Sequence, residues 1–296
     1  MLTKKRIIKI AIETTPGTKV SGSVPVLVED FEIKPTSPFE QRAGGGLYLG
    51  NTVPGTLGEL TGTCSFTVEL RSSAGVTFTM PKAQYKEISE GERDGLIVYE
   101  ASAQLNNSSG DDWLTINKST GTLGSGIDEL LKTSGFVLSS TTYSPHSVLA
   151  NQKTLSIDVW EDGIKKGLAG AQAKMSVEFD TGKRVLLKFE YSGIWQAPVD
   201  EALPSFSPGS TAVLHARGGT FTIGGVAKKI SKLSLDCGQQ IAPRPDVNAT
   251  SGIAYYSITN YDPVVSFDPE AELVASYDIH GIWLAGTEAA IVFSAA

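Results

Sequence analysis

The 296-residue sequence has few of the residues from which metal sites are usually built. It contains two cysteines, Cys64 and Cys237, and three widely separated histidines, His146, His215 and His280. No Cys-x-x-Cys spacing is present, so the pattern does not predict a zinc site. The two cysteines have the option of pairing, but isolated thiols on alternating strands are more often small buried hydrophobic residues. We expect two buried thiols and no metal or other cofactor.

Long apolar runs are also missing. No stretch approaches the roughly 20 apolar residues that span a bilayer, and Lys9 interrupts the N-terminal apolar run too early for a signal peptide. We expect no membrane partner. The chain is expected to fold in the cytoplasm where it is made, or to leave by a route that the sequence does not announce.

An excess of basic residues is lacking as well. The formal net charge is −7, which opposes tight binding of nucleic acid because such binding needs clustered cations to displace counterions. The same acidity is compatible with a protein that lets nucleic acid slide past without holding it.

Catalytic motifs are absent in the same way. The glycine clusters at 44–46, 218–219 and 224–225 are not followed by Lys-Ser/Thr, so we interpret them as turn glycines and not as a phosphate-binding loop. Asp111 and Asp112 form an acidic pair without an evident base or metal partner. We expect no enzymatic activity, with a hydrolase that places two carboxylates on a β scaffold as an alternative.

The feature that dominates the sequence is alternation at period two, which is typical of half-buried strands. The strongest example covers residues 61–70, where the polar positions are Thr63, Ser65, Thr67 and Glu69. Further strands are predicted at 4–12, 26–33, 76–80, 153–161, 171–180, 184–191, 228–237 and 289–294, and their polar positions include Ser156, Asp158 and Glu178. Hairpin turns are predicted at 161–163, 181–182 and 221–226, and a surface loop at 104–124.

This pattern predicts a mainly β protein with two packed antiparallel sheets, a sandwich or barrel, flanked by a short helix and long extended loops. The helix is predicted over residues 125–135, with Ser125 as cap, Asp128 as capping-box acid and Gly135 as stop. Its narrow apolar stripe, suited to packing on a sheet, consists of Ile127, Leu130 and Leu131. A second helix is predicted from Asp268, as cap before a proline, to about residue 276.

The period-two alternation is absent between residues 34 and 58, and we predict an extended arm at 34–60. We predict that the arm belongs to a single elaborated domain, 1–296. Its apolar residues, too many for a solvated linker, are Phe39, Leu47, Tyr48, Leu49 and Val53. Long excursions of this kind are usually functional or disordered. We expect the arm to pack on another copy of the chain, and a loop folded back on its own domain is an equal alternative.

Two groups of side chains permit a different function. The tryptophans Trp160, Trp195 and Trp283 suit stacking on a sugar, although core or interface anchoring is favoured. A carbohydrate-binding or adhesin-type β-sandwich is therefore the alternative to a structural role. Lys228, Lys229 and Lys232 form a basic cluster that we expect on a solvated edge.

Several short motifs resemble those of bacteriophage tail tube proteins. A Leu-Leu-x-x-x-Gly-Phe helix followed by a Tyr-x-Pro element is present as Leu130 to Phe136 and Tyr143 to Pro145. The likeness continues through residues 13–17, 155–163, 167–170, 189–193, 259–263 and 266–269.

The resemblance implies two packed β-sheets with a flanking helix, as in the type VI secretion tube, and protomers that join inner strands in rings, usually of six. Stacked rings would form the tube of the virion tail, assembled in the host cytoplasm, through which double-stranded DNA passes without tight binding. Expected partners are further copies of the chain and the tail terminator and tail tip proteins. Arms would bridge successive rings.

Within this resemblance the residues expected to face the lumen are Thr63, Ser65, Thr67, Glu69, Ser156, Asp158 and Glu178. Lys174 and Lys188 complicate the expectation, because a lumen dense in lysine would grip DNA. The chain is also nearly twice as long as a minimal tube subunit. The additional residues form loops, an outer decoration, or a second sandwich that would reduce the number of chains in each ring.

Overall fold

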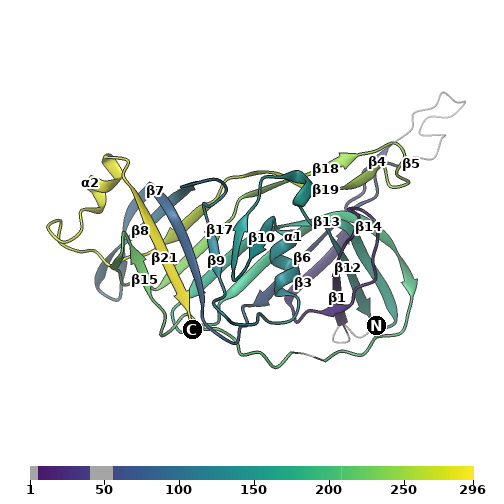
Figure 1. Cartoon of the computed structure of the whole chain (residues 1–296), viewed down its shortest axis with the longest axis horizontal. Coiled ribbons are helices and arrows are strands. Elements are labelled where there is room, and N and C mark those ends of the chain that lie inside the picture. The colour runs from purple at the N-terminus through teal and green to yellow at the C-terminus, as the bar shows by residue number, and fades with distance from the viewer. Residues whose placement is uncertain (1–5, 41–55, 208) are drawn as a thin grey trace, which may run out of the picture.

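The computed structural model describes residues 6–40, 56–207 and 209–296. It confirms a mainly β protein, in which seventeen strands join one continuous antiparallel sheet and two further pairs of strands form small sheets (Figure 1). The continuous sheet folds into a sandwich-like architecture because two long strands, β7 (Val76–Arg93) and β13 (Ile164–Asp180), change neighbours along their length.

One part of the sheet is an eight-stranded layer in which every neighbouring pair is antiparallel. Its strands, in order across the layer, are β3 (Glu29–Pro35), β6 (Thr61–Glu69), β14 (Leu186–Asp200), β13, β17 (Lys232–Asp236), β20 (Val264–Phe267), β8 (Leu96–Asn106) and the C-terminal half of β7.

The N-terminal half of β7 belongs to a second group of strands. It pairs with β9 (Thr115–Asn117) on one side and with β21 (Glu288–Ala295) on the other. Beyond these lie β11 (Thr142–Pro145), β10 (Phe136–Ser139), β15 (Phe221–Ile223) and β16 (Val226–Ala227). The N-terminal half of β13 extends through β12 (Leu155–Glu161) and β1 (Arg6–Ile12) to β2 (Val24–Pro25). The small sheets are β18 (Gln239–Pro245) with β19 (Ile253–Tyr261), and β4 (Phe39–Glu40) with β5 (Thr56–Leu57).

One large hydrophobic core joins the two groups of strands. The ring of Phe179 in β13 lies 5.3 Å from that of Phe78 in β7 and 3.9 Å from that of Phe293 in β21, measured between centroids. Burying such rings contributes about 1.5–3 kcal/mol each. Cys64 and Cys237 are unpaired and buried in this core, which confirms that they act as small hydrophobic residues.

The first helix, α1 (Ile127–Thr133), packs its predicted stripe into the core, with Ile127, Leu130 and Leu131 at most 2% exposed. Its predicted N-cap is wrong. Gly126 in the left-handed region starts the helix, while the hydroxyl of Ser125 donates to the carbonyl of Pro25. Asp128 accepts hydrogen bonds from Lys132 and Tyr143 and does not close a capping box.

The helix predicted from Asp268 to residue 276 is wrong, because the carboxylate of Asp268 binds distant parts of the chain. The second helix is α2 (Ile279–Leu284), which is capped by Asp278 and lies at one end of the molecule (Figure 1). A 3₁₀ turn spans Leu149–Asn151. The predicted loop at 104–124 contains the end of β8 and the whole of β9.

The basic cluster is only partly on a solvated edge. Lys228 is 8% exposed, with its ammonium 2.9 Å from Glu272 and 3.8 Å from the ring centre of Tyr277. The strand predicted at 228–237 is shorter than predicted and runs from Lys232 to Asp236. Lys229 and Lys232 remain exposed, as predicted.

Candidate functional site: the polar face of the eight-stranded layer

The side of the eight-stranded layer that points away from the core is polar across all its strands. Cross-strand registers place Ser65 beside Glu190, Glu190 beside Lys174, and Ser176 beside Asp236. Ser234 then lies beside Ser266, and Ser266 beside Ser102. Period-two alternation thus puts one set of polar positions on one surface, because neighbouring strands are in register.

We call this surface the polar face. It carries two adjoining hollows of about 820 and 680 Å³, which both include residues of β13 and β17. Their charged residues are Asp30, Glu32, Lys34, Glu87, Glu100, Lys174, Glu178, Asp180, Lys188, Glu190, Lys232 and Asp236. Eight carboxylates and four lysines give the lining of these two hollows a net charge of −4.

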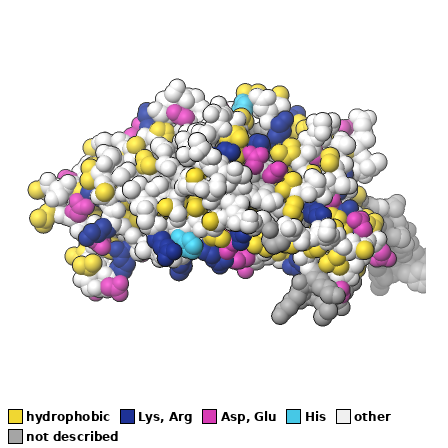
Figure 2. All heavy atoms as spheres, turned by 60° about the horizontal axis from the view of Figure 1, so that its bottom comes forward, with side chains coloured by type: hydrophobic (Ala, Val, Ile, Leu, Met, Phe, Trp, Pro, Cys, Tyr) yellow, Lys and Arg dark blue, Asp and Glu magenta, His cyan; other side chains and the backbone are white. Residues whose placement is uncertain are grey.

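The lysines of the polar face lie next to carboxylates. The ammonium of Lys188 is 2.5 Å from Glu178, that of Lys34 is 3.3 Å from Glu32, and that of Lys232 is 3.5 Å from Glu100. Lys174 stands directly opposite Glu190 in the strand register. The positive charge of these lysines is therefore distributed among negative charges. Basic and acidic side chains are likewise interspersed on the face shown in Figure 2.

Four of the residues expected to face a lumen lie on the polar face. Thr63, Ser65 and Glu178 are half-buried on it, and Thr67 lies at its floor with 5% exposure. Glu69 lies at the end of β6 and is 9% exposed. Its carboxylate is held by the guanidinium groups of Arg71 and Arg184. Burial opposes ionisation of Glu69, but these hydrogen bonds outweigh it and lower its pKa.

Ser156 and Asp158 do not lie on an open face, so their assignment to a lumen surface is wrong. Both are fully buried because residues 14–22 fold over β12. The hydroxyl of Ser156 donates to buried Glu13, and the carboxylate of Asp158 lies 2.6 Å from the ammonium of Lys19. These groups fasten the N-terminal segment, and their role is structural.

The predicted arm is described only at its ends. Residues 34 and 35 continue β3, and the residues before and after the gap pair as the small β4–β5 sheet. Phe39 is 66% exposed there, and Leu57 is 63% exposed. Leu47, Tyr48, Leu49 and Val53 lie outside the described residues. At this end of the molecule two apolar side chains therefore face solvent.

A second exposed apolar area lies at the opposite end, around α2 (Figure 2). Leu273 is 80% exposed, Val274 70% and Leu284 78%. We call these residues, with Trp283, the α2 tip. Exposed apolar groups that gather at one place mark surfaces for association.

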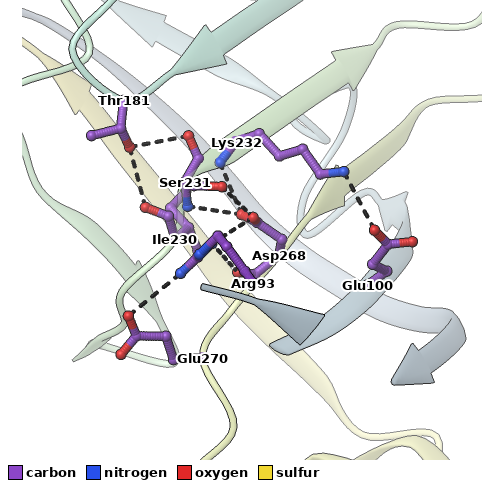
Figure 3. A network of polar contacts seen from close by, with 8 residues as sticks. All are labelled: Arg93, Glu100, Thr181, Ile230, Ser231, Lys232, Asp268 and Glu270. Atoms are coloured by element: carbon purple, nitrogen blue, oxygen red, sulfur yellow. Dashed lines mark hydrogen bonds and ion pairs between the residues drawn. The ribbon is translucent and has the colours of Figure 1, made fainter. Parts of the chain in front are cut away.

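A polar network fastens the segment that leads to the α2 tip (Figure 3). Asp268 is 3% exposed and accepts hydrogen bonds from the backbone N–H groups of Ser231 and Lys232, both at 2.8 Å, and from the hydroxyl of Ser231. Its carboxylate also lies 2.6 Å from Arg93, which reaches Glu270 at 3.4 Å. Burial opposes ionisation of Asp268, but the Ser231 and Lys232 hydrogen bonds and Arg93 outweigh it and lower its pKa.

The tryptophans do not form an exposed platform within the described ranges. Trp160 is 4% exposed and its indole N–H donates to Glu201. Trp195 packs against the core, and only Trp283 is exposed, at 42%. This bears out the anchoring interpretation for Trp160 and Trp195.

The sequence pattern did not reveal the polar-face residues of β3, β20 and β8. Ser266 and Ser102 complete the polar face, and Glu32 extends it at the β3 edge. Alternation in 264–267 was a usable signal, but that strand has only four residues. Among described residues, no cluster of three or more His, Cys, Asp or Glu is arranged to hold a metal ion. No helix in the described ranges has the length and apolarity to cross a membrane.

No protein-family model matches this chain, and a comparison with curated proteins finds no significant match.

Proposed function

We propose that this protein is a structural subunit of a bacteriophage tail tube. Copies of the chain associate in rings, the rings stack, and the resulting conduit carries double-stranded DNA into the host. The protein then acts in the virion tail after assembly in the host cytoplasm. It has no catalytic role and needs no cofactor. Its further partners are the tail terminator and tail tip proteins that close the two ends of the tube.

The polar face is the observation that carries this proposal. It extends across eight strands, the charged residues that line its two hollows sum to −4, and its lysines lie next to carboxylates. A wall of this kind repels a polyanion weakly and offers it no cation cluster that would displace counterions. DNA can then pass without being held.

The two edges of the eight-stranded layer support self-association. Within the described residues, β3 pairs only with β6, and residues 87–93 of β7 pair only with β8. Open edges carry unpaired backbone groups that another strand can satisfy. The exposed residues at the two ends of the molecule, Phe39 and the α2 tip, add apolar surface for contacts between copies.

Electron microscopy of the concentrated, purified protein tests the proposal. We expect rings or tubes with an open bore. Monodisperse single particles that bind glycans on an array would favour the carbohydrate-binding alternative, and turnover of a sugar polymer would favour a hydrolase.

A thiol probe tests which surface lines the bore. In a Ser234→Cys variant the new thiol stands on the polar face, while the two native thiols are buried. A maleimide carried on a large polymer should label the variant before assembly and fail to label it in tubes. A small maleimide should label both forms. Equal labelling of tubes by the large reagent would place the polar face outside and refute the proposal.

A further inference from the structure

We propose that each ring of the tube contains three copies of this chain, joined by pairing of β3 in one copy with β7 in the next. The inference rests on the proposed function and adds the number of subunits and the seam between them. The polar face of one chain lines only part of the proposed bore, so the bore is incomplete without neighbouring copies.

The order of strands allows β3 and β7 of neighbouring copies to pair as antiparallel strands. All seven pairings in the eight-stranded layer are antiparallel, so β3 and β7, at its two edges, run in opposite directions. Copies related by rotation about the tube axis keep the same polarity. The β7 strand of one copy therefore meets the β3 strand of the next in antiparallel orientation, and the closed barrel alternates throughout.

The number of strands fixes the diameter of the barrel. Strands lie about 4.8 Å apart, and a tilt of about 40° widens a barrel by a factor of about 1.3. Three copies supply 24 strands, which gives a backbone diameter of roughly 37–48 Å. Inward side chains occupy about 5 Å on each side, half the distance between packed sheets, and leave a bore of roughly 27–38 Å.

This bore suits duplex DNA, which is roughly 20 Å across and carries a layer of water and counterions. Two copies would give 16 strands and a bore of roughly 14–22 Å, too narrow for the hydrated duplex. Six copies would give 48 strands and a bore of roughly 63–86 Å, in which the wall would not guide DNA. Four copies, with a bore of roughly 39–54 Å, also leave the duplex loosely held. Three copies fit best.

The halves of the layer are each associated with a short helix that ends in the same way. Gly135 follows α1 and Gly286 follows α2, both in the left-handed region; β10 begins at the next residue after Gly135, and β21 begins two residues after Gly286. The chain thus supplies two helix-flanked sections of wall.

Cross-linking of assembled tubes tests the number and the seam together. Exposed Glu32 in β3 and exposed Ser89 in β7, which both lie on the polar face, are replaced in a double Glu32→Cys, Ser89→Cys variant and treated with a flexible bis-maleimide. The two positions are separated by the width of the layer within one chain, so links form between copies. The native cysteines are buried and do not interfere. A single Glu32→Cys variant is the matched control, because rotation brings no two β3 edges together.

We expect denaturing gels to show a ladder that ends at three chains, about 94 kDa from a subunit of 31.3 kDa. The single variant should give no ladder. A ladder that continues to six chains, or tubes in which the double variant gives no ladder, would overturn this inference and leave the proposed function intact. Absence of rings and tubes under all conditions would overturn both.

Discussion

Removal of the Asp268 carboxylate should destabilise the protein strongly, because this buried group holds the segment before α2 to the sheet. In Asp268→Ala the two backbone N–H groups of Ser231 and Lys232 lose their acceptor, and Arg93, with a side chain 25% exposed, loses its closest carboxylate. Breaking a buried ion pair by removing one partner costs about 3–5 kcal/mol. We expect a loss of that size in the free energy of unfolding.

The variant Asp268→Asn separates charge from shape. One side-chain oxygen still accepts from the two backbone N–H groups, but the charge that faces Arg93 is gone. A charge-assisted hydrogen bond contributes about 1.5–3 kcal/mol, so Asp268→Asn should cost less than Asp268→Ala. Urea unfolding followed by tryptophan fluorescence measures both variants. Glu32→Gln, which removes an exposed partner of Lys34, is the control and should leave the midpoint unchanged.

The same network predicts a dependence on pH. The pKa of Asp268 is lower in the folded protein than its ordinary value. The unfolded chain therefore binds the proton more tightly, and the stabilisation is present above about pH 4 and lost as the pH falls through the folded pKa. Asp268→Asn should lack this part of the acid dependence. A wild-type and an Asp268→Asn protein that unfold with the same midpoint from pH 7 to pH 3 would refute the reasoning.

Three other outcomes follow from the packing and the charges. Leu130→Ala in α1 should lower the free energy of unfolding by about 2–5 kcal/mol, while Glu129→Ala on the same helix should change it by less than about 0.5 kcal/mol; equal effects would contradict the packing of the stripe. Burial raises the pKa of Cys64 and of Cys237, so neither thiol should react with a disulfide reagent at pH 8 until urea unfolds the chain. Reaction of either thiol with the reagent in the native protein would show that the core is open. Assembly should increase with salt, because the seam brings two groups of carboxylates close together: Glu29, Asp30 and Glu32 of one copy, and Glu87, Glu90 and Glu92 of the next. Salt screens their repulsion, since the Debye length falls from about 10 Å at 0.1 M to about 3 Å at 1 M. Light scattering that falls with added sodium chloride would argue against this seam.

A variant of the polar face tests whether this face leaves DNA unbound. Glu178→Lys combined with Asp236→Lys raises the net charge of the residues that line the two hollows from −4 to zero and removes the carboxylate closest to Lys188. Tubes of this variant should retain DNA at low salt and release it as salt rises, whereas wild-type tubes should not retain it. Retention by wild-type tubes would contradict a passive wall.

The sequence was sufficient for features that depend on neighbours along the chain. Alternation in residues 61–70 correctly identified β6 and its buried side, and the stripe of Ile127, Leu130 and Leu131 correctly predicted how α1 packs. In both patterns, apolar residues recur with the period of the helix or strand, so that they lie on the one face that packs against the core. The turns at 161–163 and 181–182 were found for the same reason.

Errors arose where a polar side chain binds a distant part of the chain. Ser156 and Asp158 alternate like surface residues, but residues 14–22 cover them through Glu13 and Lys19. Asp268 before a proline has the local pattern of a helix cap, yet its carboxylate is occupied by Ser231 and Arg93. A capping preference of about 1 kcal/mol is outweighed by several buried hydrogen bonds. Pairings between elements far apart in sequence are not encoded in any local period.

A reconstruction of the assembled protein by electron cryomicroscopy would show which surface of the chain lines the bore. We predict a tube whose continuous bore is lined by side chains of β6, β14, β13 and β17, including Ser65, Lys188, Glu178 and Ser234. A solitary particle at every concentration and salt, or a tube whose bore is lined by any other surface of the chain, would contradict it.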